Sequence, residues 1–282
     1  MDPNAPARTP TMTHLLRRTL ILFPLLLGAA PAASQDAGKV QRLTVPITDP
    51  SRPITVHASL FTGGIFMEPH EGNQILIEVV PADDPETPGR PDGMRVIPNR
   101  SLGLTVEEEG NKVSIGGDYS GGIDRIVMKV PRRTSVLAST VLEGDIVVRG
   151  IEGELELQST NGSITATDVA GSVVAQTTTG EIKVSFTAIQ SGKSMSFVTF
   201  TGNVDVTFPG DLKADLHLNA GHGEIYTDFE FDLVPTESQM KSERSGKKYR
   251  VQLDQEVRAR IKGGGAEMHF KTWNGDIFIR SR

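Results

Sequence analysis

The feature that most constrains the fold is a glycine at every ninth position from Gly144 to Gly180, namely Gly144, Gly153, Gly162, Gly171 and Gly180. Each is followed by a polar residue and a short run in which apolar and polar residues alternate. This alternation is typical of a strand with one buried face, and the glycines indicate turns between strands. A spacing of nine residues leaves no room for a crossover helix. Consecutive strands must therefore pair as hairpins or follow one another around a coil.

The glycines form two alternating classes, so the full repeat is eighteen residues. We call the two strands that flank a glycine of the first class (Gly144, Gly162, Gly180) a rung. Inward positions that recur with the longer period are Ile146/Ile164/Ile182, Val148/Ala166/Val184, Ile151/Val169 and Leu137/Leu155/Val173. Equivalent side chains stacked from rung to rung are how a β-solenoid buries a core, so the pattern predicts one, right-handed by default. The alternative is an antiparallel sandwich of hairpins, which usually shows two-residue Asn-Gly loops.

Three further rungs follow with looser spacing, around Gly202, Gly223 and Gly275. Apolar pairs precede them at matching offsets: Met195 and Phe197, Leu216 and Leu218, Met268 and Phe270. The excess chain before the last rung, residues 229–262, is charged and is predicted to be a solvated insertion, with a functional arm as the alternative. Within it, Leu253 to Ile261 suits a short helix or an outer strand pair.

The N-terminal part alternates less regularly and predicts the capped beginning of the same solenoid. Thr62 to Ile65 resembles a degenerate rung, and Pro81 to Arg95 is predicted to be an exposed loop. A separate small sandwich over residues 36–130 is the alternative. The predicted strands are Val40–Ile47, Ile54–Leu60, Ile65–Met67, Gln74–Val80, Leu102–Val106, Lys112–Ile115 and Arg125–Val130.

Residues 1–34 have the pattern of an export signal, because Arg17 and Arg18 precede an apolar run and small residues follow it. Met12 is an alternative start, and an ordinary first helix is the alternative interpretation. No later apolar run approaches the length of a membrane span, so no transmembrane segment is expected in the mature chain. The chain has no cysteine, which excludes disulfides and thiol chemistry. Its net charge of −6 argues against nucleic acid as a partner.

A family resemblance is carried by FPGDLKADLHLNAGHGEIYTDF, KGGGAEMHFKTWNGDIFIR and STNGSITATDVAGSVVAQTTTGEIKV. These phrases resemble the bacterial putative-adhesin family, exported proteins of unknown function with Thr-Asn-Gly-x-Ile rungs. The resemblance covers about Gly38 to Arg282 and implies one parallel β-solenoid domain outside the cytoplasm, with adhesion suggested by analogy. The chain departs from the family pattern at Ala220 to Gly223 and at Trp273.

No catalytic motif is found, and we predict neither enzymatic activity nor a cofactor. Gly263 to Gly265 precedes a strand and lacks the lysine and hydroxyl of a phosphate loop, and no nucleophile elbow is present. The best catalytic alternative is a carbohydrate-cleaving β-helix. Its acid pair would be Asp145 and Glu181, two rungs or about 9–10 Å apart in the column of residues that follow the turn glycines. Acids at such turns more often accept backbone hydrogen bonds.

One constellation has the residue types of a metal site. His217 and His269 each lie six residues before the glycine of their rung, and Asp215 and Glu267 each lie eight before it. On adjacent rungs all four would point outward and could hold a divalent metal such as zinc. The alternative is a polar outer face, because apolar residues alternate inward beside them.

Hydroxyl side chains recur at one place in successive rungs: Ser159 and Thr160, Thr177 to Thr179, and Thr199 and Thr201. Stacked hydroxyls favour a structural role, and an adhesive face is the alternative.

These observations predict an all-β, single-domain parallel β-helix with coils of roughly 18–22 residues, an irregular N-terminal part and a charged insertion. The domain covers residues 35–282 after the signal of residues 1–34. The predicted function is a non-enzymatic, adhesin-like binding or scaffolding module of the bacterial cell envelope, periplasmic or on the cell surface. Its partner would be an envelope polymer or protein. The alternatives are a carbohydrate-active β-helix enzyme and a structural envelope protein with a protein partner.

Overall fold

The structure is a computed structural model that describes residues 40–82, 102–118, 122–235, 240–245, 248–253 and 256–282, and only the backbone of 240–253. The predicted signal at 1–34 and most of the predicted loop at 81–95 lie outside the described residues. The described ranges belong to one compact unit, Ala37–Arg282. They contain strands and no helix, so the predicted all-β class is confirmed.

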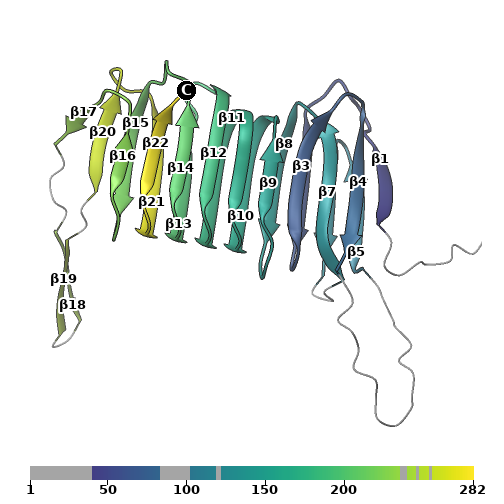
Figure 1. The fold of residues 1–282 in the computed structure, drawn as a ribbon, viewed down its shortest axis with the longest axis horizontal. Helices are drawn as coiled ribbons and strands as arrows, with labels where there is room; N and C mark the ends of the chain where they lie inside the picture. The colour runs from purple at the N-terminus through teal and green to yellow at the C-terminus, as the bar shows by residue number, and fades with distance from the viewer. Residues whose placement is uncertain (1–39, 83–101, 119–121, 236–239, 246–247, 254–255) are drawn as a thin grey trace, which may run out of the picture. The chain divides into compact units, whose positions relative to one another are not determined.

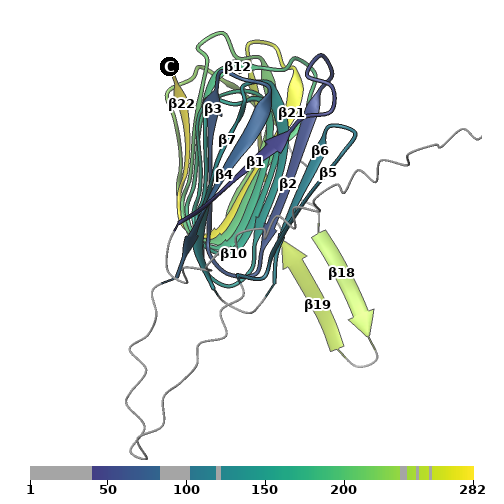
Figure 2. The ribbon, with the colours of Figure 1, turned by 90° about the vertical axis from the view of Figure 1, so that its right-hand side faces the viewer.

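Most strands form two facing rows (Figure 2), and neighbours within a row run parallel. The first row is β6 (Lys112–Gly117), β2 (Ile54–Leu60), β8 (Thr134–Thr140), β10 (Glu152–Asn161), the second half of β11 (Ile164–Thr179), β13 (Met195–Thr201), β21 (Ala266–Asn274) and β15 (Ala214–Ala220). The second row is β7 (Ile123–Pro131), β3 (Gly64–His70), β9 (Ile146–Arg149), the first half of β11, β12 (Ile182–Ile189), β14 (Val204–Phe208), β22 (Ile277–Ser281) and β16 (Ile225–Thr227).

The core lies between the rows and is built of columns of like side chains. Ile164 pairs with Ile146 on one side and with Ile182 on the other, and all three are fully buried. Toward the C-terminus the columns become aromatic, with Phe186 stacked on Phe208 at 5.1 Å between ring centroids. Apolar burial of this kind stabilises the fold by about 25 cal/mol per Å² removed from water.

One predicted equivalence is wrong by one residue. Leu155 pairs with Val136, and Leu137 instead faces outward and is exposed. The turn after β8 holds three residues between Thr140 and the glycine, where the next rung holds two. A one-residue slip exchanges the two faces of a strand, because side chains alternate across it.

The turn glycines are required by close backbone approach. A Cβ on Gly162 would collide with the carbonyl oxygen of Gly144, and a Cβ on Gly180 with that of Gly162. The second class forms its own column, because a Cβ on Gly171 would collide with the carbonyl oxygen of Gly153. Each class therefore stacks on itself, which explains the eighteen-residue repeat.

The rungs are stacked in chain order only in the middle (Figure 1). At the C-terminal end, β21 and β22 lie between β13–β14 and β15–β16, which are consecutive in the chain. At the N-terminal end, β2 and β3 lie in the same way between β6–β7 and β8–β9. We call these two units the inserted rungs.

Antiparallel strands cover the ends of the rows. At the N-terminal end, β5 (Leu104–Glu109) pairs with β6, β4 (Gln74–Pro81) with β7, and β1 (Gln41–Pro46) with β4. Because β2 and β3 also continue the main rows, the strands described between residues 40 and 131 are part of the same sheet and not a separate sandwich.

At the C-terminal end, β20 (Val257–Ile261) pairs with β15, and β17 (Asp232–Val234) pairs with β20. Part of the predicted insertion is thus an outer strand pair, with Ala259 and Ile261 buried against the core. The strands β18 (Met240–Ser245) and β19 (Lys248–Leu253) form a separate hairpin.

Candidate functional site

A ladder of buried hydroxyls lies just inside the glycine turns. Its members Thr140, Ser159, Thr177, Thr199 and Thr272 are all less than one-tenth exposed. Thr177 Oγ1 donates to the carbonyl oxygen of Gly162 at 2.9 Å, and Thr272 Oγ1 donates to that of Gly202 at 2.9 Å. Within the predicted threonine run, Thr177 is therefore structural, whereas Thr178 and Thr179 are exposed.

A second ladder follows the residues immediately after the turn glycines. The backbone N–H of Ser163 donates to Asp145 Oδ1 at 2.8 Å, and that of Glu224 donates to Asp276 Oδ1 at 2.9 Å. Asn203 Oδ1 accepts from the N–H of Asp276 at 2.9 Å. These acids and amides act as the turn hydrogen-bond acceptors that short polar side chains often provide.

The four predicted metal candidates are neighbours in the sheet, as their spacing predicts. Asp215 pairs with Glu267 and His217 with His269 in the parallel register of β15 and β21. The two imidazoles are stacked, with ring centroids 4.6 Å apart. The flanking Leu216, Leu218, Met268 and Phe270 are buried, so the four polar side chains lie on the outer face of the first row.

The segment around β20 contacts these side chains. His217 Nδ1 lies 2.6 Å from Glu256 Oε1, and Arg260 Nε donates to Asp215 Oδ1 at 2.9 Å. The Arg260 guanidinium, with the N–H of Gly265, lowers the pKa of the Asp215 carboxyl. Burial acts to raise the pKa of Glu256, but hydrogen bonds from His217 and Arg258 outweigh it, and this pKa is lowered. The histidine–carboxylate cluster therefore attaches the outer strand β20 to the main row.

Within the described ranges, no group of three or more histidine and acidic side chains is positioned to hold a metal ion. Asp215 is occupied by a guanidinium and His217 by a carboxylate. Zinc ligation by Asp215, His217, Glu267 and His269 stays a prediction.

Exposed aromatic rings form a feature that the sequence analysis did not identify. Phe200 and Trp273 are about half exposed and stack with planes 4° apart and ring centroids 6.1 Å apart. His222 lies edge-on against the indole at 5.2 Å, and a Cβ on Gly221 would meet the backbone of Trp273. The two departures from the family pattern, at Ala220 to Gly223 and at Trp273, thus contact each other. The two departures lie at corresponding places in their rungs, and this correspondence was the sequence signal that could have predicted the contact.

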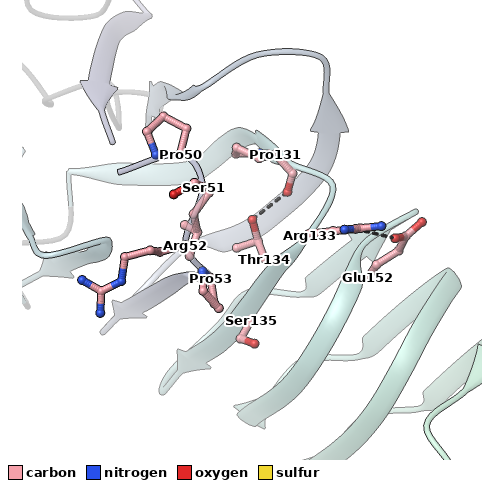
Figure 3. A pocket seen from close by; sticks show the side chains of 10 residues that line it. Pro50, Ser51, Arg52, Pro53, Pro131, Arg133, Thr134, Ser135 and Glu152 are labelled. Carbon is pink, nitrogen blue, oxygen red and sulfur yellow. Dashed lines mark hydrogen bonds and ion pairs between the residues drawn. The ribbon is translucent and has the colours of Figure 1, made fainter. Parts of the chain in front are cut away.

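A depression of about 500 Å³ lies at the opposite edge, beside the turns that precede β2 and β8 (Figure 3). Its lining includes Pro50, Pro53 and Pro131. Thr134 Oγ1 donates to the carbonyl oxygen of Pro131 at 2.6 Å, and Arg133 Nε lies 3.8 Å from Glu152 Oε2. Thr134, Arg133 and Glu152 in its lining therefore have protein partners.

The fold defines an all-β class in which turn glycines stack in columns between two rows of strands. Residues 137–265 match the family model described as Toastrack DUF4097. This match over residues 137–265 confirms the resemblance found in the sequence. Among curated proteins, none matches this chain.

Two solved structures are similar to it. One, described as a putative cell adhesion protein from Clostridium sporogenes, has 9% sequence identity and a TM-score of 0.41, and the match covers 86% of this chain and 100% of that one. The other, a putative adhesin from Bacteroides fragilis, has 10% identity and a TM-score of 0.28, over 86% of this chain and 97% of that one. As for the membrane, the described residues include no helix with the length and apolar content that a bilayer span requires.

Proposed function

We propose that this protein is an exported, adhesin-like binding module of the bacterial cell envelope, in the periplasm or on the cell surface, and that it catalyses no reaction. The observation that carries the proposal is that acidic side chains at the turns have a structural role, whereas aromatic side chains remain exposed. Asp145 and Asp276, which follow turn glycines, accept backbone hydrogen bonds, whereas half-exposed aromatic rings lie on the outer face. Exposed aromatic rings on a rigid scaffold are typical of binding surfaces.

We also propose the finer architecture: a parallel β-helix with coils of roughly 18–22 residues, formed by residues 35–282 after removal of a signal at 1–34. The parallel register between Ile146, Ile164 and Ile182 supports it, because these residues are eighteen positions apart. The Arg17–Arg18 pair and the apolar run that follows support export.

The function is tested by co-sedimentation of the purified protein with bacterial envelope fragments, together with an assay for new reducing ends in envelope polysaccharide. We expect saturable sedimentation and no release of reducing ends. In the matched variants Asp145→Ala and Glu181→Ala, sedimentation should be unchanged. Cleavage that either variant abolishes would establish the carbohydrate-active alternative instead, and absence of sedimentation would contradict the binding proposal.

Zinc binding by Asp215, His217, Glu267 and His269 is proposed as a separate property of the outer face. Zinc titration by calorimetry, at a pH where imidazole is neutral, tests it. The double variant His217→Ala with His269→Ala should lose the binding heat, because imidazole is the preferred nitrogen ligand. His222→Ala is the control, since this exposed histidine lies outside the cluster. Equal affinity in the double variant and the wild type would refute the metal role.

A further inference from the structure

The aromatic pair belongs to a larger outward surface on the first row. Phe200 and Thr178 occupy equivalent positions on neighbouring strands, as the pairings on either side of them show. In the same way Trp273 is equivalent to Phe200, and Thr160 to Thr178. Two positions earlier, Gln158 pairs with Gln176. We call this surface the amide–aromatic face; its exposed members are Gln158, Thr160, Gln176, Thr178, Phe200 and Trp273.

The chemistry of this face differs from that of the chain as a whole. The protein is acidic, with a net charge of −6, whereas the six members carry amide, hydroxyl and aromatic groups. Two charged side chains border them: Lys271, which continues the row of Gln158 and Gln176 through Val198, and Glu156, which accepts a hydrogen bond from Gln158 Nε2 at 2.9 Å. Amides and hydroxyls both donate and accept hydrogen bonds. A ligand that suits them is uncharged and rich in hydroxyls.

The geometry of the rings adds a stacking surface. Neighbouring strands are about 4.8 Å apart, and the 6.1 Å between the ring centroids exceeds this spacing, so the parallel rings are offset. Both rings are about half exposed. Phe200 has the small Thr178 as its neighbour on the side away from Trp273, whereas the indole of Trp273 also has His222 edge-on against it. The negative face of an aromatic ring attracts polarised C–H groups, which line the faces of a pyranose ring.

We propose that the amide–aromatic face binds a neutral polysaccharide, with a sugar ring stacked on Phe200 and Trp273 and its hydroxyls hydrogen-bonded by the threonine and glutamine side chains. From Thr160 to Trp273 the face spans three strand spacings, roughly 14 Å, which is the length of a short oligosaccharide. The inference rests on the proposed envelope-binding function and names the ligand class for it. Binding to a protein is the competing outcome, and the test below distinguishes it.

The chain contains a single tryptophan, so its fluorescence reports on this face alone. The full chain is titrated with cellohexaose and chitohexaose as neutral probes and with polygalacturonate as an acidic one. We expect a saturable change in Trp273 emission with at least one neutral probe and none with the acidic polymer. Phe200→Ala should weaken binding at least about tenfold, and Trp273→Ala, followed by calorimetry, should do the same.

The matched control is Tyr226→Ala. Tyr226 is 49% exposed and stacks on Phe278, whose neighbour Arg280 is paired with Asp205, so this second aromatic stack is surrounded by charge. Affinity should stay within about twofold of wild type in this variant, and thermal unfolding checks that every variant is folded. No response to either neutral probe, or equal weakening by Phe200→Ala and Tyr226→Ala, would overturn the inference.

Envelope co-sedimentation separates failure of this inference from failure of the proposed function. If Phe200→Ala and Trp273→Ala still sediment like wild type, the face is not the site and the envelope-binding function stands. If protease treatment of the envelope abolishes sedimentation and the oligosaccharides do not bind, the partner is a protein and the polysaccharide inference is wrong. If the wild type does not sediment at all, the proposed function itself fails.

Discussion

Between Thr134 and Phe208 the rungs follow one another in chain order, whereas at each end an inserted rung separates two rungs that are consecutive in the chain. The middle is built from contacts about eighteen residues apart. The C-terminal inserted rung contacts strands about 52 and 73 residues away in the chain, as in the pairs Asp215–Glu267 and Ser196–His269. Closing such loops costs more entropy, though the cost rises slowly with length.

The difference teaches how a stack of repeats can protect its ends. A repeat protein tends to fray from its terminal units, which have a neighbour on one side only. Here the last strands of the chain, β21 and β22, have partners on both sides. The rungs at the ends of the rows are β6–β7 and β15–β16. Each is connected in the chain to the rung on the other side of an inserted rung, and β4, β5 and β20 cover them. Both ends should therefore unfold with the middle.

The largest expected effect is at the turn glycines. Gly180→Ala in the middle places a Cβ against the carbonyl oxygen of Gly162, and Gly275→Ala in the inserted rung places one against that of Gly202. Each should lower the free energy of unfolding by about 3 kcal/mol or more, because strain and a steric clash with backbone combine. Denaturant unfolding measures both.

The control for this pair is Gly116→Ala, because a Cβ on Gly116 meets nothing within 4 Å. Its effect should stay within about 0.5 kcal/mol. A large cost for Gly180→Ala with a negligible cost for Gly275→Ala would mean that the inserted rung is loosely attached.

A smaller effect is expected from the buried hydroxyl ladder. Thr177→Val in the middle and Thr272→Val in the inserted rung each remove a hydrogen bond to a glycine carbonyl. Each should cost about 1–2 kcal/mol in chemical denaturation, because a buried carbonyl loses its donor. Thr178→Val, on the exposed neighbour, should be nearly neutral. Unequal costs for the two buried positions would show that the inserted rung is packed differently from the middle.

The smallest effect concerns the outer strand at the C-terminal end. The pKa of Asp215 is lowered, chiefly by the hydrogen bond from Arg260. A lowered carboxylate pKa contributes stability that is present above the unfolded value of about 3.9 and is lost as pH falls through the folded value. Because both side chains are partly exposed, the contribution should not exceed about 1 kcal/mol.

Thermal unfolding of wild type and Asp215→Asn at pH 6 and at pH 3 tests this dependence. The wild type should be the more stable at pH 6, and the difference should shrink at pH 3. A difference that does not change with pH would show that the ion pair does not stabilise the end.

Much of the local structure was predictable, because apolar alternation and close-packed glycines leave direct marks in a sequence. The strand Ile54–Leu60 and the pairing of His217 with His269 are examples. The order of the rungs was not predictable, because every rung presents the same surfaces to its neighbours and any order satisfies the pattern. The prediction for Leu137 was wrong because positions were aligned by their distance from the turn glycine. The turn after β8 has one extra residue, which shifts this alignment by one. The aromatic pair was overlooked because Phe200 and Trp273 are 73 residues apart in the chain and meet only through the inserted rung.

The inserted order is tested most directly by engineered disulfides in this cysteine-free chain. Val198 pairs with Lys271, and Lys271 pairs with Asn219 on its other side. Oxidation and non-reducing peptide mapping should therefore show a bond in Val198→Cys/Lys271→Cys and in Lys271→Cys/Asn219→Cys. The pair Val198→Cys/Asn219→Cys should give none, because two strand spacings, about 9.6 Å, exceed the reach of a disulfide. A bond in that third variant, with none in the first two, would show rungs stacked in chain order and contradict the account.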